Sequence, residues 1–223
     1  MLPLVKGERV VALTARHLTL GDHALRFTVP IVAVIAGYTW VVAPRTPRWV
    51  GHLVAVTVLG LCARRAARTG EWGLRWSELR PALRGAALVT VPAVLSIVGA
   101  GWVLDTWHGR AQGWRELVFL VPWACGQQFA LQTVLLREAQ AVTSRRGGIA
   151  LASVVFGALH LPNPFLAPLT LLAAFIWCFL YDRHPNWLPL ALSHALATLA
   201  ILASLDPGLT GRLRVGYSYL LLD

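Results

Sequence analysis

The segment Gly126-Gln127-Gln128-Phe129-Ala130-Leu131-Gln132 places three glutamines in the middle of an apolar run that extends from Leu117 to Leu136. That run has 20 residues, which is about the length of a helix that crosses a hydrocarbon core of about 30 Å. Because lipid offers no hydrogen bonds, amide side chains at this depth must face other protein. Polar residues inside membrane segments commonly mark functional sites. We therefore predict a buried polar site around these glutamines.

The composition of the chain is that of a multi-span membrane protein. Of 223 residues, 57% are hydrophobic and 13% are charged, and the mean hydropathy is +0.61. A net charge of +10 would suit a nucleic-acid-binding protein, but the 20 Lys and Arg are spread over short connectors between apolar runs. The three cysteines lie inside apolar runs without CxxC spacing, which excludes a disulfide framework and a zinc knuckle. We predict the lipid bilayer as a partner and no nucleic acid.

The apolar runs predict an all-α membrane bundle of about six to eight transmembrane helices. The expected spans are residues 27–43, 49–63, 86–104, 117–136, 149 to about 161, 165–181 and 187–205. Between residues 64 and 84, arginines alternate with Trp72, Trp76 and Leu79 at helical spacing, which predicts a short amphipathic helix on the membrane surface. The chain then divides into three parts. These are a basic N-terminal part with two spans and the interfacial helix (1–85), a membrane core (86–205) and a C-terminal tail (206–223).

The distribution of basic residues predicts the orientation in the membrane. With seven spans, the N-terminus and the connectors 64–85, 137–148 and 182–186 lie on one side and carry 14 of the 20 Lys and Arg. Cytoplasmic loops carry an excess of Lys and Arg. We therefore predict an integral, multi-pass protein of the cell membrane whose N-terminus is cytoplasmic.

Two histidines lie in later spans at a depth similar to that of the glutamines. At a rise of 1.5 Å per residue, Gln127, His160 and His194 each stand about 10 to 16 Å from the cytoplasmic end of their span. One polar centre near the middle of the membrane is therefore geometrically possible. Spacings of four residues also place partners on shared helical faces: Gln128 with Gln132, Phe156 with His160, and His194 with Thr198.

An alternative is that these residues only join helices. Hydrogen bonds between membrane helices are common and contribute about 0.6 kcal/mol on average. The composition and spacing leave this alternative open beside a functional site.

The order and spacing of these residues resemble the CPBP family of membrane proteins, the CAAX prenyl endopeptidase and bacteriocin-processing group also called Abi proteins. The family has a Glu-Glu pair followed four residues on by Arg, then Phe-x-x-x-His, then His-x-x-x-Asn. Phe156 and His160 match the second motif, and His194 matches the start of the third. At the remaining motif positions this sequence differs from the family: it has Gln127 and Gln128 in place of the glutamates, Gln132 in place of Arg, and Thr198 in place of Asn. The resemblance covers about residues 86–205, with the Gly73–Arg75 segment before it.

The resemblance implies an intramembrane metalloendopeptidase, a peptide hydrolase acting on a membrane-associated peptide or protein substrate. In the family, paired glutamates and histidines activate a water, with or without a divalent metal such as zinc. Carried over by position, the resemblance implies catalytic roles for Gln127, Gln128, His160 and His194, with His160 and His194 also as the metal ligands. It implies that Gln132, Phe156 and Thr198 line the cavity.

The substitutions bear directly on this chemistry. A glutamine has no titratable carboxylate, so it cannot take a proton from water as a general base. Glu116 and Glu138 are each 11 residues from Gln127, about 16 Å along a helix. Two imidazoles are fewer than the three protein ligands of a catalytic zinc. Ser193 precedes His194, but neighbours in a helix point about 100° apart and cannot form a catalytic dyad.

Two main hypotheses follow from the sequence. The first is a divergent peptidase that uses His160 and His194. The second is a catalytically inactive relative that binds a membrane peptide or partner as a chaperone, regulator or immunity factor. A small transporter or a helix-bundle scaffold is a third.

Overall fold

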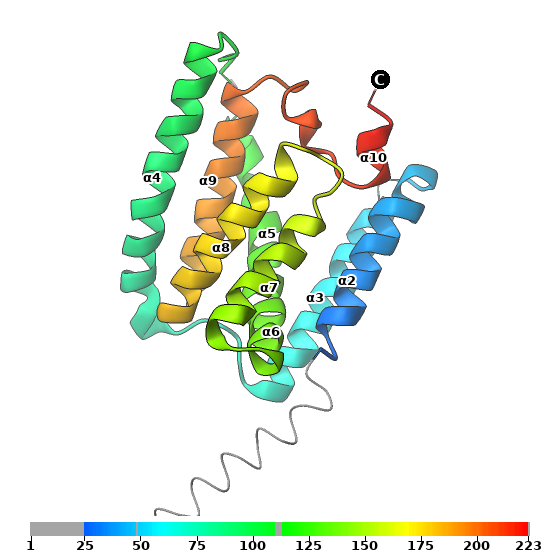
Figure 1. Cartoon of the computed structure of the whole chain (residues 1–223), viewed down its shortest axis with the longest axis vertical. Helices are drawn as coiled ribbons and strands as arrows, with labels where there is room; N and C mark the ends of the chain where they lie inside the picture. The colour runs from blue at the N-terminus through cyan, green and yellow to red at the C-terminus, as the bar shows by residue number, and fades with distance from the viewer. Residues whose placement is uncertain (1–24, 48, 110–112, 223) are drawn as a thin grey trace, which may run out of the picture.

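The apolar runs fold into helices that run up and down between the two ends of one bundle (Figure 1). The computed structural model describes residues 25–47, 49–109 and 113–222. In chain order the elements are α2 (Thr28–Gly37), η1 (Tyr38–Val42), η2 (Ala43–Arg45), α3 (Trp49–Thr69), η3 (Trp76–Glu78), α4 (Leu79–Val103), α5 (Gly113–Ala130), η4 (Leu131–Leu135), α6 (Leu136–Val142), α7 (Arg145–Ala158), α8 (Leu166–Arg183), α9 (Leu188–Ser204), η5 (Gly211–Leu213) and α10 (Tyr217–Leu220). The segments η1 and η4 are π-helical.

The predicted all-α membrane class is confirmed. Among the described residues, five helical stretches are long and apolar enough to cross a membrane: Thr28–Arg45, Trp49–Thr69, Trp76–Val103, Arg115–Val142 and Leu166–Arg183. The apolar helix α9 is shorter, at 17 residues. Helix α7 has 14 residues, fewer than a full crossing needs. The chain is therefore a multi-pass membrane protein.

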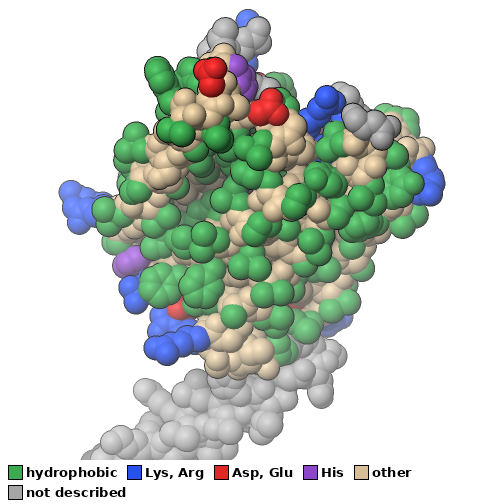
Figure 2. All heavy atoms as spheres, turned by 45° about the horizontal axis from the view of Figure 1, so that its top comes forward, with side chains coloured by type: hydrophobic (Ala, Val, Ile, Leu, Met, Phe, Trp, Pro, Cys, Tyr) green, Lys and Arg blue, Asp and Glu red, His purple; other side chains and the backbone are tan. Residues whose placement is uncertain are grey.

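The outer surface agrees with a lipid environment. Large apolar side chains such as Leu88, Val103 and Phe119 are more than three-quarters exposed. Figure 2 shows hydrophobic side chains over the middle of one face, with Lys and Arg at its margins. An apolar surface of this extent marks contact with lipid or protein rather than with water.

The interfacial helix predicted over residues 64–84 is wrong. Helix α3 continues to Thr69, and α4 already begins at Leu79, so the two spans are longer than predicted and a short connector joins them. Helix α3 can continue past its expected end because Arg65 is buried beside acidic partners rather than exposed to lipid. Trp72 and Trp76 lie in the connector, and both are exposed.

Helix α7 begins four residues before the predicted span. Ser144 caps it, since the Ser144 hydroxyl accepts a hydrogen bond from the Gly147 backbone N–H at 3.0 Å. The helix ends at Ala158, just before Leu161-Pro162, where the prolines were predicted to stop it.

The connectors predicted to share one side of the membrane lie together. The start of α2 and the α3–α4, α6–α7 and α8–α9 connectors are at the lower end in Figure 1. Hydrogen bonds join them. The Arg75 N–H donates to the Pro185 carbonyl at 3.0 Å, and the Gln140 amide donates to the Asp182 carboxylate at 2.9 Å. Most of the basic residues therefore gather at one end of the bundle.

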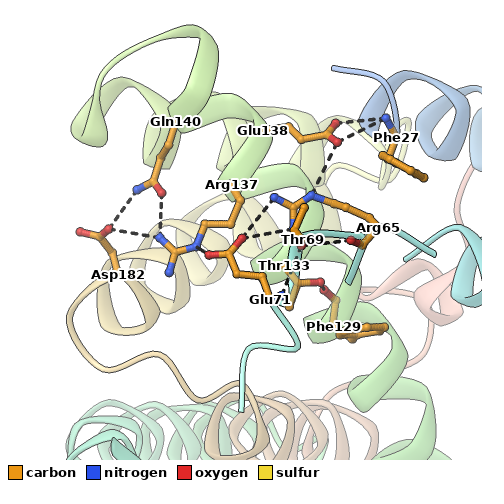
Figure 3. Close-up of polar contacts among 10 residues, drawn as sticks. All are labelled: Phe27, Arg65, Thr69, Glu71, Phe129, Thr133, Arg137, Glu138, Gln140 and Asp182. Atoms are coloured by element: carbon orange, nitrogen blue, oxygen red, sulfur yellow. Dashed lines mark hydrogen bonds and ion pairs between the residues drawn. The ribbon is translucent and has the colours of Figure 1, made fainter. Parts of the chain in front are cut away.

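Glu138 of α6 ties α2 and α3 to the core at this end (Figure 3). Its carboxylate accepts the backbone N–H groups of Phe27 and Thr28 at 3.2 and 2.8 Å, at the start of α2. Arg65 of α3 lies 3.6 Å from the same carboxylate. Glu138 thereby satisfies free N–H groups at a helix N-terminus and neutralises a buried guanidinium.

Arg137 extends the same network to α8. It lies 3.3 Å from Glu71 and 3.9 Å from Asp182, and it donates to the Gln140 amide oxygen at 3.0 Å. Arg145, at the start of α7, also pairs with Asp182. Arg137 and Glu138 therefore hold α2, α3 and α8 around α6 (Figure 3), and Arg145 joins α7 to the same network through Asp182.

We predict that Glu138→Ala lowers the free energy of unfolding by about 3 to 5 kcal/mol, because it leaves the buried Arg65 without this partner and α2 without its cap. Glu78→Ala is the control, since it breaks the half-exposed Glu78–His184 contact of 2.9 Å, worth about 0 to 1 kcal/mol. Reversible unfolding in detergent measures both. Equal losses in the two variants would contradict the role given to Glu138.

Candidate functional site

Gln127, Gln128 and Gln132, here called the glutamine row, lie on the continuous helix formed by α5, η4 and α6. Gln128 and Gln132 are fully buried, and the Gln132 amide donates to the Gln128 amide oxygen at 2.9 Å. The π-helical segment η4 begins at Leu131 and contains Gln132. Single π-helical turns inside α-helices occur frequently at functional sites. The polar segment predicted from the sequence is thus a local irregularity of the helix as well.

Four buried polar atoms in this region have no hydrogen-bond partner among the described residues. They are Gln127 Oε1, Gln128 Nε2, Gln132 Oε1 and His194 Nδ1. Leaving a buried polar group unpaired costs about 1 to 3 kcal/mol, and folded proteins contain few of them. A cluster of such atoms is expected where a protein binds a hydrogen-bonding molecule.

His160 and His194 both lie beside one aromatic ring. The Phe156 ring centroid is 4.9 Å from that of His160 and 6.5 Å from that of His194. His160 Nδ1 lies 2.7 Å from the Phe156 carbonyl oxygen. Because a carbonyl can only accept, Nδ1 carries the proton and Nε2 presents a lone pair. The second and third sequence motifs therefore meet at Phe156.

The α6–α7 hairpin brings His160 to the depth of the glutamines. Gly148 lies so close to Gln140 that an added Cβ would stand 2.6 Å from the Gln140 backbone nitrogen. Two antiparallel helices in contact there have the same rise per residue, so Gln132 is about level with Phe156 and Gln128 with His160. The Cys178 thiol beside both Ser153 and Gln132 agrees with this alignment.

Helix α9 brings His194 to a similar depth. It runs antiparallel to α5, with Ala124 packed against Ala191 and Ala195, and with the rings of Phe129 and Trp187 5.7 Å apart. By these contacts His194 stands about 6 to 9 Å along the axis from the level of Gln128. Thr198 lies one turn farther and is half-buried. The histidines and glutamines are thus within about two helical turns of one another in depth.

The two histidines do not complete a metal site. Over residues 25–47, 49–109 and 113–222, no group of three or more His, Cys, Asp or Glu could hold an ion. A catalytic zinc has three such protein ligands, and the neighbouring amides of Gln127 and Gln128 carry no charge. The donors present therefore do not fit a catalytic divalent metal.

One residue of this region carried no signal in the sequence. Trp177 of α8 is buried, and its ring centroid lies 4.7 Å from that of His194. A tryptophan in an apolar run is ordinary for a membrane helix, so only its contact with His194 of α9 identifies it.

Comparison with known proteins agrees with the motifs. A family model described as Type II CAAX prenyl endopeptidase Rce1-like matches residues 110–200. No curated protein and no solved structure is significantly similar to the chain. The matched residues include the glutamine row, Phe156 and both histidines. The chain is therefore a multi-pass membrane protein in which residues 110–200 are similar to the Rce1-like family of type II CAAX prenyl endopeptidases.

Proposed function

We propose that this protein binds a membrane-inserted peptide segment at Gln127, Gln128, His160 and His194, and that it does not hydrolyse the peptide by the glutamate chemistry of its family. The observation that carries the proposal is the buried Gln128–Gln132 pair, which keeps an unpartnered donor at Gln128 Nε2 and an unpartnered acceptor at Gln132 Oε1. Such a protein acts as a chaperone, regulator or immunity factor for its membrane partner. Its core is residues 86–205, and its N-terminus is cytoplasmic in the cell membrane.

A peptide group is the natural complement of the glutamine row. It offers one carbonyl acceptor and one N–H donor, which match the free amide N–H and amide oxygen of the row. Inside a bilayer an unwound peptide segment cannot satisfy these groups with water. Hydrogen bonds to Gln128 and Gln132 would stabilise such a segment, and Phe156 supplies an apolar contact beside them.

The acid nearest the row on its cytoplasmic side does not replace the lost carboxylates. General-base catalysis needs a group within hydrogen-bond reach of the attacking water. Glu138 lies six residues beyond Gln132, about 9 Å along the helix, and its carboxylate is held by Arg65 and the start of α2. The substitution of glutamine for glutamate therefore removes the family's base.

A second candidate function is slow hydrolysis with a histidine as the base. The observation in its favour is that the lone pair of His160 Nε2 is left free for a proton when Nδ1 bonds to Phe156. This candidate predicts cleavage by the natural chain that depends on His160 and His194.

We predict that Gln127→Met weakens peptide binding about tenfold, because it removes one hydrogen bond to the ligand, and that it leaves the free energy of unfolding unchanged or higher. The physical reason is that the buried Gln127 Oε1 has no partner in the described chain, so its loss costs the fold nothing. Energy transfer to a labelled apolar peptide of about 20 residues in phospholipid vesicles measures binding.

Thr133→Val is the matched control for Gln127→Met. It removes a buried hydroxyl from the same helix, but that hydroxyl already donates to the Phe129 carbonyl at 2.7 Å. It should leave binding unchanged. Binding that is equally weak, or equally strong, in both variants would contradict a role for the glutamine in recognition.

We predict that the natural chain does not cleave such a peptide and that the double variant Gln127→Glu with Gln128→Glu gains cleavage. A general base contributes about 10²-fold or more to hydrolysis. Mass spectrometry of the peptide after incubation in vesicles measures the products. Cleavage by the natural chain that His160→Ala abolishes would refute the binding function and support the second candidate.

A further inference from the structure

The His194 ring packs against two other aromatic rings. Its Nδ1 is buried and has no partner among the described residues. The Trp177 ring lies 4.7 Å away at an interplanar angle of 31°, and the Phe156 ring lies 6.5 Å away, nearly perpendicular at 77°. A functional histidine is normally oriented by a hydrogen bond to one ring nitrogen. In this protein the position of the Trp177 ring takes over that role.

Ser193 anchors Trp177. The indole Nε1–H of Trp177 donates to the Ser193 hydroxyl oxygen at 3.1 Å, and both side chains are buried. Ser193 and His194 are neighbours on α9, so their side chains diverge by about 100°. This divergence excludes a catalytic dyad of Ser193 and His194. It lets Ser193 accept a hydrogen bond from the indole N–H of Trp177 while the His194 ring packs against the Trp177 ring.

Ser193 is itself fixed by α4. Its hydroxyl oxygen lies 2.6 Å from the Thr90 hydroxyl oxygen, and the latter lies 2.6 Å from the Ala86 carbonyl oxygen. Because the carbonyl can only accept, Thr90 donates its one proton to Ala86, and Ser193 donates to Thr90 while it accepts from Trp177. One directed chain of hydrogen bonds therefore runs from α8 through α9 to α4, and it leaves the Ser193 hydroxyl no freedom to rotate.

We propose that Ser193 is a positioning residue for His194, acting through Trp177, and that it sets the orientation in which the imidazole meets a bound peptide. The effect on peptide binding rests on the proposed function, whereas the effect on the His194 ring does not. The two can therefore fail separately.

The test is nuclear magnetic resonance of the full chain, labelled at tryptophan and histidine, in phospholipid nanodiscs. The variants Trp177→Phe and His194→Ala identify the two signals. In Ser193→Ala we expect the Trp177 indole proton to lose its hydrogen-bonded shift and the His194 ring signals to move. Binding of the labelled apolar peptide should weaken about tenfold, the loss of one hydrogen bond.

Thr170→Val is the matched control. The Thr170 hydroxyl is also buried on α8, seven residues before Trp177, but it donates within its own helix to the Leu166 carbonyl at 2.7 Å. We expect Thr170→Val to move neither signal and to leave binding unchanged. If Ser193→Ala does not fold, Thr90→Val removes the hydrogen bond behind Ser193, together with the bond within α4 to Ala86, and should move the same two signals by less.

A double-mutant cycle separates positioning from general damage. If Ser193 acts through Trp177, the double variant of Ser193→Ala and Trp177→Phe binds the peptide no more weakly than the weaker single variant. Additive losses, or His194 signals that stay in place in Ser193→Ala and Thr90→Val, would overturn the proposal. If the His194 signals move but the natural chain binds no peptide, the positioning role stands and the proposed function falls.

Discussion

Every polar group that this chain carries into the bilayer must find its partner inside the protein, because lipid supplies none. Two sets of polar side chains on the α5–α6 helix meet this constraint in opposite ways. At the C-terminal end of that helix, Arg137 and Glu138 are paired with groups from α2, α3 and α8 and from the α3–α4 connector. About one and a half to three turns away, the glutamine row keeps unpartnered atoms. The paired set holds the bundle together, and the unpaired set is therefore available for binding.

The membrane class and the burial of the glutamines could be predicted from the sequence. An apolar run of 20 residues with glutamines at its middle admits few interpretations. The four-residue spacing of Gln128 and Gln132 also gave their shared face correctly, and the structure joins them by a hydrogen bond. These features are local in the chain, so that helix geometry alone determines them.

Features that depend on partners distant in the sequence could not be predicted in this way. The arginine-rich segment 64–84 has the pattern of an interfacial helix, but Arg65 lies beside Glu138, 73 residues later. That pairing permits α3 to continue through a charged stretch. Likewise, Trp177 lies in an ordinary apolar run, and only its contact with His194 on another helix distinguishes it. Long-range pairing overrides a local periodicity in both cases.

Under the proposed function, glutamine in place of the family's glutamates changes what His160 and His194 require. Beside a glutamate, an imidazole can be oriented and charged by its neighbour. A neutral amide cannot stabilise a charge on the imidazole in this way. A charge on a buried ring that no neighbour compensates is costly. Orientation by a tilted and a nearly perpendicular ring, as for His194 beside Trp177 and Phe156, demands no charge at all. Neutral amides and ring-held imidazoles are thus mutually consistent, and together they suit recognition of an uncharged peptide backbone better than activation of water.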